Sequence, residues 1–113
     1  MTHKMKLNPH PFESVKSGRK TIEMRLFDEK RSAIRQGDII EFTETDSGEK
    51  ITCTVLNIFR YADFEELYRN HDKISIGYSE DENADPNDMK KYYPEEKIKK
   101  YGTAAIEIAL INE

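Results

Sequence analysis

Short runs of alternating apolar and polar residues are the feature that most constrains how this chain folds. In residues 20–27, KTIEMRLF, apolar side chains occupy every second position, which is the period of a β-strand. The pattern returns in residues 50–61, KITCTVLNIFRY, and in residues 103–111, TAAIEIALI. Residues 38–45, DIIEFTET, are separated from the 50–61 run by a DSGE turn, so these two runs predict an antiparallel hairpin.

Short helices are expected to fill the gaps between these strands. Prolines open three of the helical segments, where a missing amide donor costs little, and Asp63 is placed to cap the fourth. The segments are residues 9–18, 62–70, 86–93 and 94–102. Because helices do not alternate regularly with strands, we expect an α+β, mainly β fold: a small, mostly antiparallel, strongly curved sheet or barrel with short flanking helices.

The length and the composition predict one compact domain over residues 1–113. The chain is 36% hydrophobic and 35% charged, which supplies a small core and a polar surface. Its one cysteine, Cys53, excludes an intramolecular disulfide and a cysteine-rich zinc site. No stretch has the length of a signal peptide core or a membrane span. We therefore expect a cytoplasmic protein without a membrane partner, monomeric by default.

Charge is distributed unevenly along the chain. Residues 1–35 hold nine Lys and Arg against four Asp and Glu, whereas residues 36–113 hold nine against eighteen. The basic first third can attract anions, unless the two parts neutralise each other in the fold. The acidic loop 80–88 is expected to be solvated. The three histidines lack metal-ligand spacing, so neither a metal nor another cofactor is expected.

Residues 18–25, GRKTIEMR, carry the strongest candidate site. Alternation places Glu23 and Arg25 on the face of the strand opposite its apolar residues, where they can form an ion pair. Lys20 lies at the strand entry after Gly18, where its ammonium can reach a phosphate or polarise a carbonyl group. The alternative is a solvated strand face with a weak surface salt bridge.

The spacing G-x-K-x-x-E-x-R, formed by Gly18, Lys20, Glu23 and Arg25, resembles the signature of ASCH domains, members of the PUA-like superfamily. The following QGDIIEF and the closing YGTAAIEIALI also resemble that family, so the resemblance spans residues 7–111. It implies a small β-barrel whose signature residues line a cleft beside the flanking helices, with RNA or a nucleotide as the ligand.

The leading hypothesis is therefore an RNA- or nucleotide-binding domain. Lys20 and Arg25 would contact phosphate or base, while Glu23 would orient Arg25 or accept a hydrogen bond from an exocyclic amine. Lys16 would add electrostatic attraction. Tyr78 is a candidate for base stacking, although it can equally pack against the barrel, as we favour for Tyr92 and Tyr93. The predicted ligand-binding residues are Arg19, Lys20, Glu23, Arg25 and Tyr78.

Two alternatives remain open. Some relatives within the family are amidohydrolases that remove the acetyl group of 4-acetylcytidine, and others are ribonucleases; the catalytic candidates here would then be Lys20 and Glu23. Glu23, however, stands where the amidohydrolases have a threonine, and a carboxylate cannot serve as a hydroxyl nucleophile. The second alternative is a module that binds a protein or another anion without nucleic acid, which fits the acidic residues 36–113.

Overall fold

The computed structural model describes residues 1–111, which form one five-stranded sheet surrounded by short helices. The strands are β1 (Thr2–Leu7), β2 (Ile22–Leu26), β3 (Ile39–Glu44), β4 (Lys50–Tyr61) and β5 (Thr103–Leu110). The helices are α1 (Pro9–Lys16), α2 (Glu29–Ser32), α3 (Phe64–Asn70), the 3₁₀-helix η1 (Pro86–Lys91) and α4 (Glu95–Tyr101). Helix α2 lies in a segment for which the sequence predicted no regular structure.

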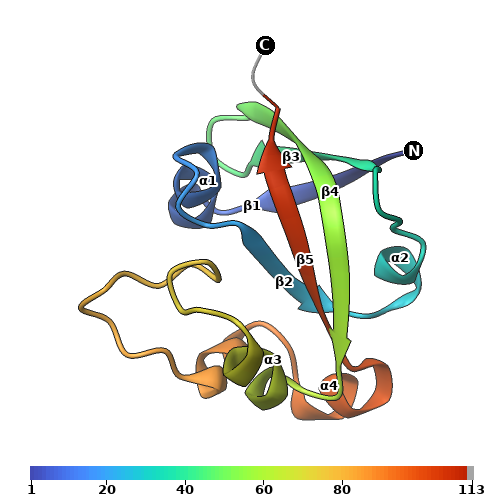
Figure 1. Ribbon diagram of the computed structural model, residues 1–113, viewed down its shortest axis with the longest axis vertical. Coiled ribbons are helices and arrows are strands. Elements are labelled where there is room, and N and C mark those ends of the chain that lie inside the picture. Colours follow the sequence, from blue (N-terminus) through green and yellow to red (C-terminus); the bar gives the residue numbers. More distant parts are fainter. Residues whose placement is uncertain (112–113) are drawn as a thin grey trace.

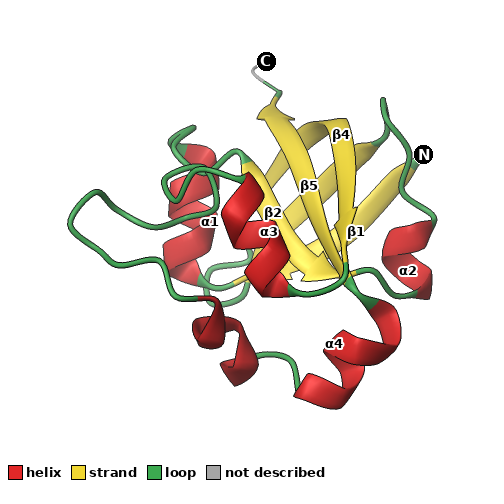
Figure 2. Cartoon of the chain, turned by 60° about the horizontal axis from the view of Figure 1, so that its bottom comes forward, coloured by secondary structure: helices red, strands yellow, loops and turns green. Residues whose placement is uncertain are grey.

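The sheet is curled into a half-barrel, which confirms the predicted fold class (Figures 1 and 2). Its strand order is β1-β3-β4-β5-β2, and three of the four pairings are antiparallel, whereas β1 and β3 are parallel. The two edge strands, β1 and β2, are joined across a seam by a side chain. The guanidinium Nη2 of Arg25 donates to the carbonyl oxygen of Lys6 at 2.8 Å.

Apolar residues pack against both faces of this sheet. One cluster lies on the concave side and includes Phe42, Cys53 and Ile106; the other includes Met24, Phe64 and Leu67. The helices α3, η1 and α4 contribute to the second cluster, so they cover the outer face of β2. Both faces of β2 are consequently buried, unlike those of a strand with one solvated side.

The charged face of β2 is buried as well as its apolar face. Glu23 pairs directly with Ile106 of the inner cluster, whereas Met24 pairs with Ala105 of the outer one. Residues directly opposite in a sheet project to the same side, so the charged face of β2 points into the half-barrel. The apolar face, with Ile22, Met24 and Leu26, is also buried and packs beneath the helices in the second cluster. The alternative of a solvated charged face is thus wrong.

Local signals explain where several elements begin and end. The carboxylate of Asp63 accepts the backbone amide of Glu66 at 2.8 Å, which caps α3 as predicted. A β-bulge between Val55 and Asn57 bends the long strand β4. No helix within residues 1–111 combines the length and the apolar character needed to cross a membrane.

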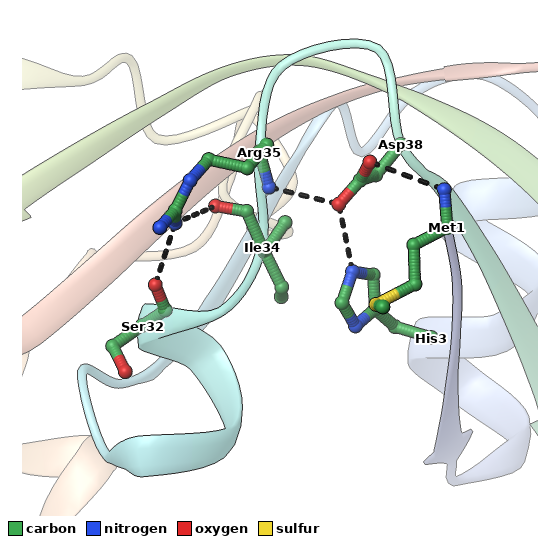
Figure 3. A network of polar contacts seen from close by, with 6 residues as sticks. All are labelled: Met1, His3, Ser32, Ile34, Arg35 and Asp38. Carbon is green, nitrogen blue, oxygen red and sulfur yellow. Dashed lines mark hydrogen bonds and ion pairs between the residues drawn. The ribbon is translucent and has the colours of Figure 1, made fainter.

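Asp38, in the QGD segment, ties the start of β1 to the loop after α2. Its carboxylate accepts from Nε2 of His3 at 2.8 Å, the amide of Arg35 at 3.0 Å and the ammonium of Met1 at 3.4 Å (Figure 3). The hydrogen bond with His3 is the main cause that lowers the pKa of Asp38 to about 2, and the Arg35 amide adds to it.

This lowered pKa predicts an acid-dependent loss of stability. Because the folded-state pKa lies below the ordinary value of 3.8, ionised Asp38 favours the folded state above that pH, and its contribution disappears as pH falls through about 2. We expect Asp38→Asn to remove this part of the loss when unfolding is measured by denaturant between neutral pH and about pH 2. The control is Asp46→Asn in an exposed turn. If the free energy of unfolding fell with decreasing pH in Asp38→Asn just as it does in the wild type, this loss of stability would not be due to Asp38.

Candidate functional site

An open pocket of about 620 Å³ lies beside the seam between β1 and β2, and we refer to it as the seam pocket. Its residues come from β1, the start of α1, the entry and body of β2, the end of β3, α3, the loop 71–85, and η1 with the two residues that follow it. That loop projects on the side of the molecule where α1 lies (Figures 1 and 2). The pocket thus forms where segments distant in sequence meet. Its ionisable residues are Lys6, His10, Lys20, Glu23, Arg25, Glu82, Asp88 and Lys91, and its tyrosines are Tyr68, Tyr78, Tyr92 and Tyr93.

Three charged side chains form a linked group in this pocket. One carboxylate oxygen of Glu23 contacts the Lys20 ammonium at 2.9 Å, and the other accepts from Nε of Arg25 at 2.8 Å. The exposed fractions of the side chains are 9% for Lys20, 3% for Glu23 and 16% for Arg25. The predicted ion pair between Glu23 and Arg25 is therefore present, and Lys20 joins it. Lys20 does not extend freely from the turn, because it folds back onto this buried carboxylate.

Electrostatics hold Glu23 ionised within this group. Burial by itself raises the pKa of Glu23, but the positive charges of Lys20 and Arg25 and their hydrogen bonds lower it further than burial raises it. For Arg25 the same two effects act in the opposite direction. Burial lowers the pKa of Arg25, but the charge of Glu23 and the hydrogen bond to it raise this pKa above its ordinary value. The group therefore carries two positive charges and one negative charge.

The loop 71–85 packs directly against this charged group. The carbonyl of Ser75 accepts the amides of Thr21 and Ile22, both at 2.9 Å, which fixes the loop to the start of β2. Gly77 has φ of +116°, and a Cβ added there would lie 3.3 Å from Cδ of Lys20. A side chain at this position would therefore press on the Lys20 stem. The absence of a side chain at Gly77 therefore leaves room for the Lys20 stem beside Glu23.

Tyrosines make up much of the remaining lining. The Tyr78 hydroxyl donates to the carboxylate of Asp88 at 2.7 Å and also contacts the Tyr68 hydroxyl at 2.9 Å. Burial raises the pKa of Tyr78 strongly, and both hydrogen-bond partners add to the effect. Tyr93 stacks on Phe64 with ring centroids 5.9 Å apart, as expected for a packed residue. Tyr92 is 65% exposed, so its ring is accessible from the pocket, contrary to the packing that we favoured.

The structure brings four of the five predicted ligand-binding residues together: Lys20, Glu23, Arg25 and Tyr78 all line the seam pocket. Arg19 is exposed and bonds to Ser17 at 3.0 Å, and it is not among the lining residues. Lys16 is likewise outside the pocket, paired with Glu49 at 2.7 Å. The roles of these residues remain predictions.

Sequence reasoning did not find several lining residues. Lys6 alternates with buried residues along β1, which marks an exposed side chain but not its neighbour across the seam. Glu82 and Asp88 belong to the acidic loop and nevertheless reach the pocket. Cys53 is fully buried, and burial together with the charge of Glu23 raises its pKa to about 11, so it is a poor nucleophile. Among residues 1–111, no group of three or more His, Cys, Asp and Glu is arranged to hold a metal ion.

Comparisons with known proteins agree with this architecture. The ASCH domain model matches residues 5–112. The hypothetical protein PH0355 is 34% identical over 98% of this chain and 100% of its own, with a TM-score of 0.83. Protein PF0455 from Pyrococcus furiosus is 32% identical over the whole of both chains, with a TM-score of 0.77.

A more distant structure shares the fold. The S128A mutant of ZmASCH from Zymomonas mobilis is 18% identical over 98% of this chain and 73% of its own, with a TM-score of 0.69. No curated protein matches the sequence. Because the family model matches nearly the whole length of this chain, the chain belongs to the ASCH domain family.

Proposed function

We propose that this protein binds RNA or a nucleotide in the seam pocket. The observation that carries the proposal is the convergence of the group Lys20–Glu23–Arg25 with several tyrosine rings around one open pocket. Cationic donors suit phosphate and base acceptors, and aromatic rings suit the faces of unpaired bases. Cationic donors or aromatic rings alone are common in binding sites, but their combination around one pocket favours a nucleotide ligand over a flat protein surface.

The size of the pocket supports the same ligand class. A volume of about 620 Å³ lies within the range of roughly 300–1,000 Å³ typical of small-molecule sites. Such a pocket accommodates a nucleotide-sized group and does not accommodate a duplex, so recognition would involve a single-stranded or free nucleotide. Tyr92, with its largely exposed ring, is the residue best placed to stack on an entering base.

A pair of aromatic substitutions tests the proposal. We expect Tyr92→Ala to weaken binding of short single-stranded RNAs and modified nucleosides by about 5- to 150-fold, since stacking of one base contributes about 1–3 kcal/mol. The matched control is Phe59→Ala, because Phe59 is 38% exposed and does not line the pocket. Calorimetric titration gives both affinities. Equal losses in the two variants would place binding elsewhere.

The hydrolase alternative receives less support from the same geometry. In the ion pair the Lys20 ammonium donates to Glu23, and a general base would have to release that proton. Both oxygens of Glu23 are held by cations, which suits positioning better than nucleophilic attack. Incubation with 4-acetylcytidine is the direct test. If the wild type released cytidine and Lys20→Met did not, the function would be hydrolysis and not binding alone.

A further inference from the structure

We infer that the buried charged group of the seam pocket receives a terminal phosphate monoester, so that the ligand enters with its phosphate at Lys20 and Arg25. This inference rests on the proposed nucleotide binding and specifies how the ligand is oriented. The alternative orientation, in which the edge of the base meets these residues, requires no anion. The two orientations predict different ligand preferences, so they can be separated by experiment.

The first argument is charge balance. Lys20 and Arg25 contribute two positive charges and Glu23 one negative charge, which leaves a net charge of +1 on side chains that are at most 16% exposed. A partly desolvated net charge is unfavourable unless an opposite charge or a hydrogen-bond acceptor compensates it. Among the other lining residues, Lys6 and Lys91 balance Glu82 and Asp88, so the excess positive charge of the Lys, Arg, Asp and Glu that line the pocket equals that of the buried group. An entering anion would compensate it.

The second argument is the inventory of hydrogen-bond donors. Within residues 1–111, the Lys20 ammonium contacts only Glu23, although an ammonium has three N–H donors. In Arg25, Nε and Nη2 both contact Glu23, at 2.8 and 2.7 Å, and Nη2 also donates to the Lys6 carbonyl, while Nη1 has no hydrogen-bond partner among the described residues. Glu23, by contrast, uses both of its oxygens on these cations. The group therefore has N–H donors available for an acceptor on the ligand. Glu23 has no free oxygen for an exocyclic amine, which favours the other role that we expected for it, the orientation of Arg25.

The third argument is access. Lys20 is only 9% exposed and is covered on one side by Gly77, so a phosphate must enter the pocket to reach its ammonium. An internal phosphodiester carries a nucleotide on each side, and both would have to fit within the pocket. A phosphate monoester carries only one, and its base remains near the tyrosines. The structure thus favours free mononucleotides or phosphorylated RNA ends over internal RNA segments.

The test compares ligands that differ only in the phosphate. Calorimetric titrations of the wild-type chain use ribonucleosides, their 5′- and 3′-monophosphates, inorganic phosphate, and one oligoribonucleotide with and without a terminal phosphate. We expect each preferred monophosphate to bind about 10- to 100-fold more tightly than its nucleoside, because hydrogen bonds to charged groups are the strong ones. The oligoribonucleotide arm distinguishes RNA ends from free mononucleotides.

Substitutions then vary the charge of the group. Lys20→Met leaves Glu23 paired with Arg25 at a net charge of zero, and it should abolish the preference for phosphate, measured as the ratio of monophosphate to nucleoside affinity within the same variant. Combining Lys20→Met with Glu23→Gln restores a net charge of +1 and should recover the preference. Lys97→Met on α4 removes the same charge from an exposed site and should change nothing. Circular dichroism verifies that each variant is folded.

The outcomes separate the two proposals. A preference for monophosphates that follows the net charge of the group supports the inference. Equal affinity for nucleosides and monophosphates, unaffected by Lys20→Met, overturns the inference and leaves nucleotide binding in place. Failure of every nucleoside, nucleotide and RNA to bind overturns the proposed function itself.

Discussion

Replacing Glu23 by alanine is expected to destabilise the fold by about 3–5 kcal/mol, the range for removing one partner of a buried ion pair. The carboxylate is 3% exposed and bridges Lys20 and Arg25, so its loss leaves two poorly solvated cations beside each other. The Arg25 guanidinium also loses the partner that orients it toward the Lys6 carbonyl across the seam. Chemical denaturation of the two proteins measures the difference in the free energy of unfolding.

The control for this prediction is a glutamate in a surface ion pair. Glu49 contacts Lys16 at 2.7 Å, but these side chains are 46% and 45% exposed, so Glu49→Ala should cost under about 1 kcal/mol. If Glu23→Ala were no more destabilising than Glu49→Ala, the charged group would have no structural role.

Substitution of Gly102 by alanine is the second large effect that we expect. Gly102 lies between α4 and β5 with φ of 72° and ψ of −171°, a conformation that is nearly restricted to glycine. A Cβ atom there would lie 2.8 Å from the carbonyl oxygen of Tyr61, which is backbone and cannot rotate away. The strain alone costs about 1–3 kcal/mol, so with the steric clash we expect about 3 kcal/mol or more.

Gly48→Ala provides the matched comparison. Gly48 also has positive φ, +76°, but a Cβ at this position meets nothing within 4 Å. Its substitution therefore carries backbone strain without a clash, and we expect a loss of about 1 kcal/mol. Thermal and chemical denaturation of both variants give the comparison. Equal losses would mean that the close approach between Gly102 and Tyr61 is not a constraint on the fold.

The strands could be predicted from sequence because alternation is a local property. Residues 20–27 and 103–111 show it clearly, and both contain strands of the structure. Alternation identifies two faces without stating which one is inside. In β2 the apolar face lies beneath the helices and the charged face points into the half-barrel, which depends on the pairing of Glu23 with Ile106. A residue more than eighty positions away thus determines the environment of Glu23.

The signature residues could also be predicted, but their surroundings could not. The ion pair of Glu23 with Arg25 follows from their spacing on one strand face. Gly77, distant in sequence, leaves room for the Lys20 stem beside Glu23, and the pocket is lined in part by a loop that carries no periodic signal. The parallel pairing of β1 with β3 is likewise a long-range contact. The surroundings of the signature residues are therefore set by contacts between distant segments, which a local sequence pattern does not contain.

Mapping of backbone amide chemical shifts during titration with a nucleoside monophosphate tests the central claim most directly. We predict that the shifts concentrate on residues 20–25 of the strand entry and β2, on residues 76–78 of the loop, and on residues 89–93 at the end of η1, because these segments line the seam pocket. Residues of α4, which do not line it, should serve as the internal reference. Shifts that are spread over α4, or concentrated on a face away from Lys20 and Tyr92, would contradict the account.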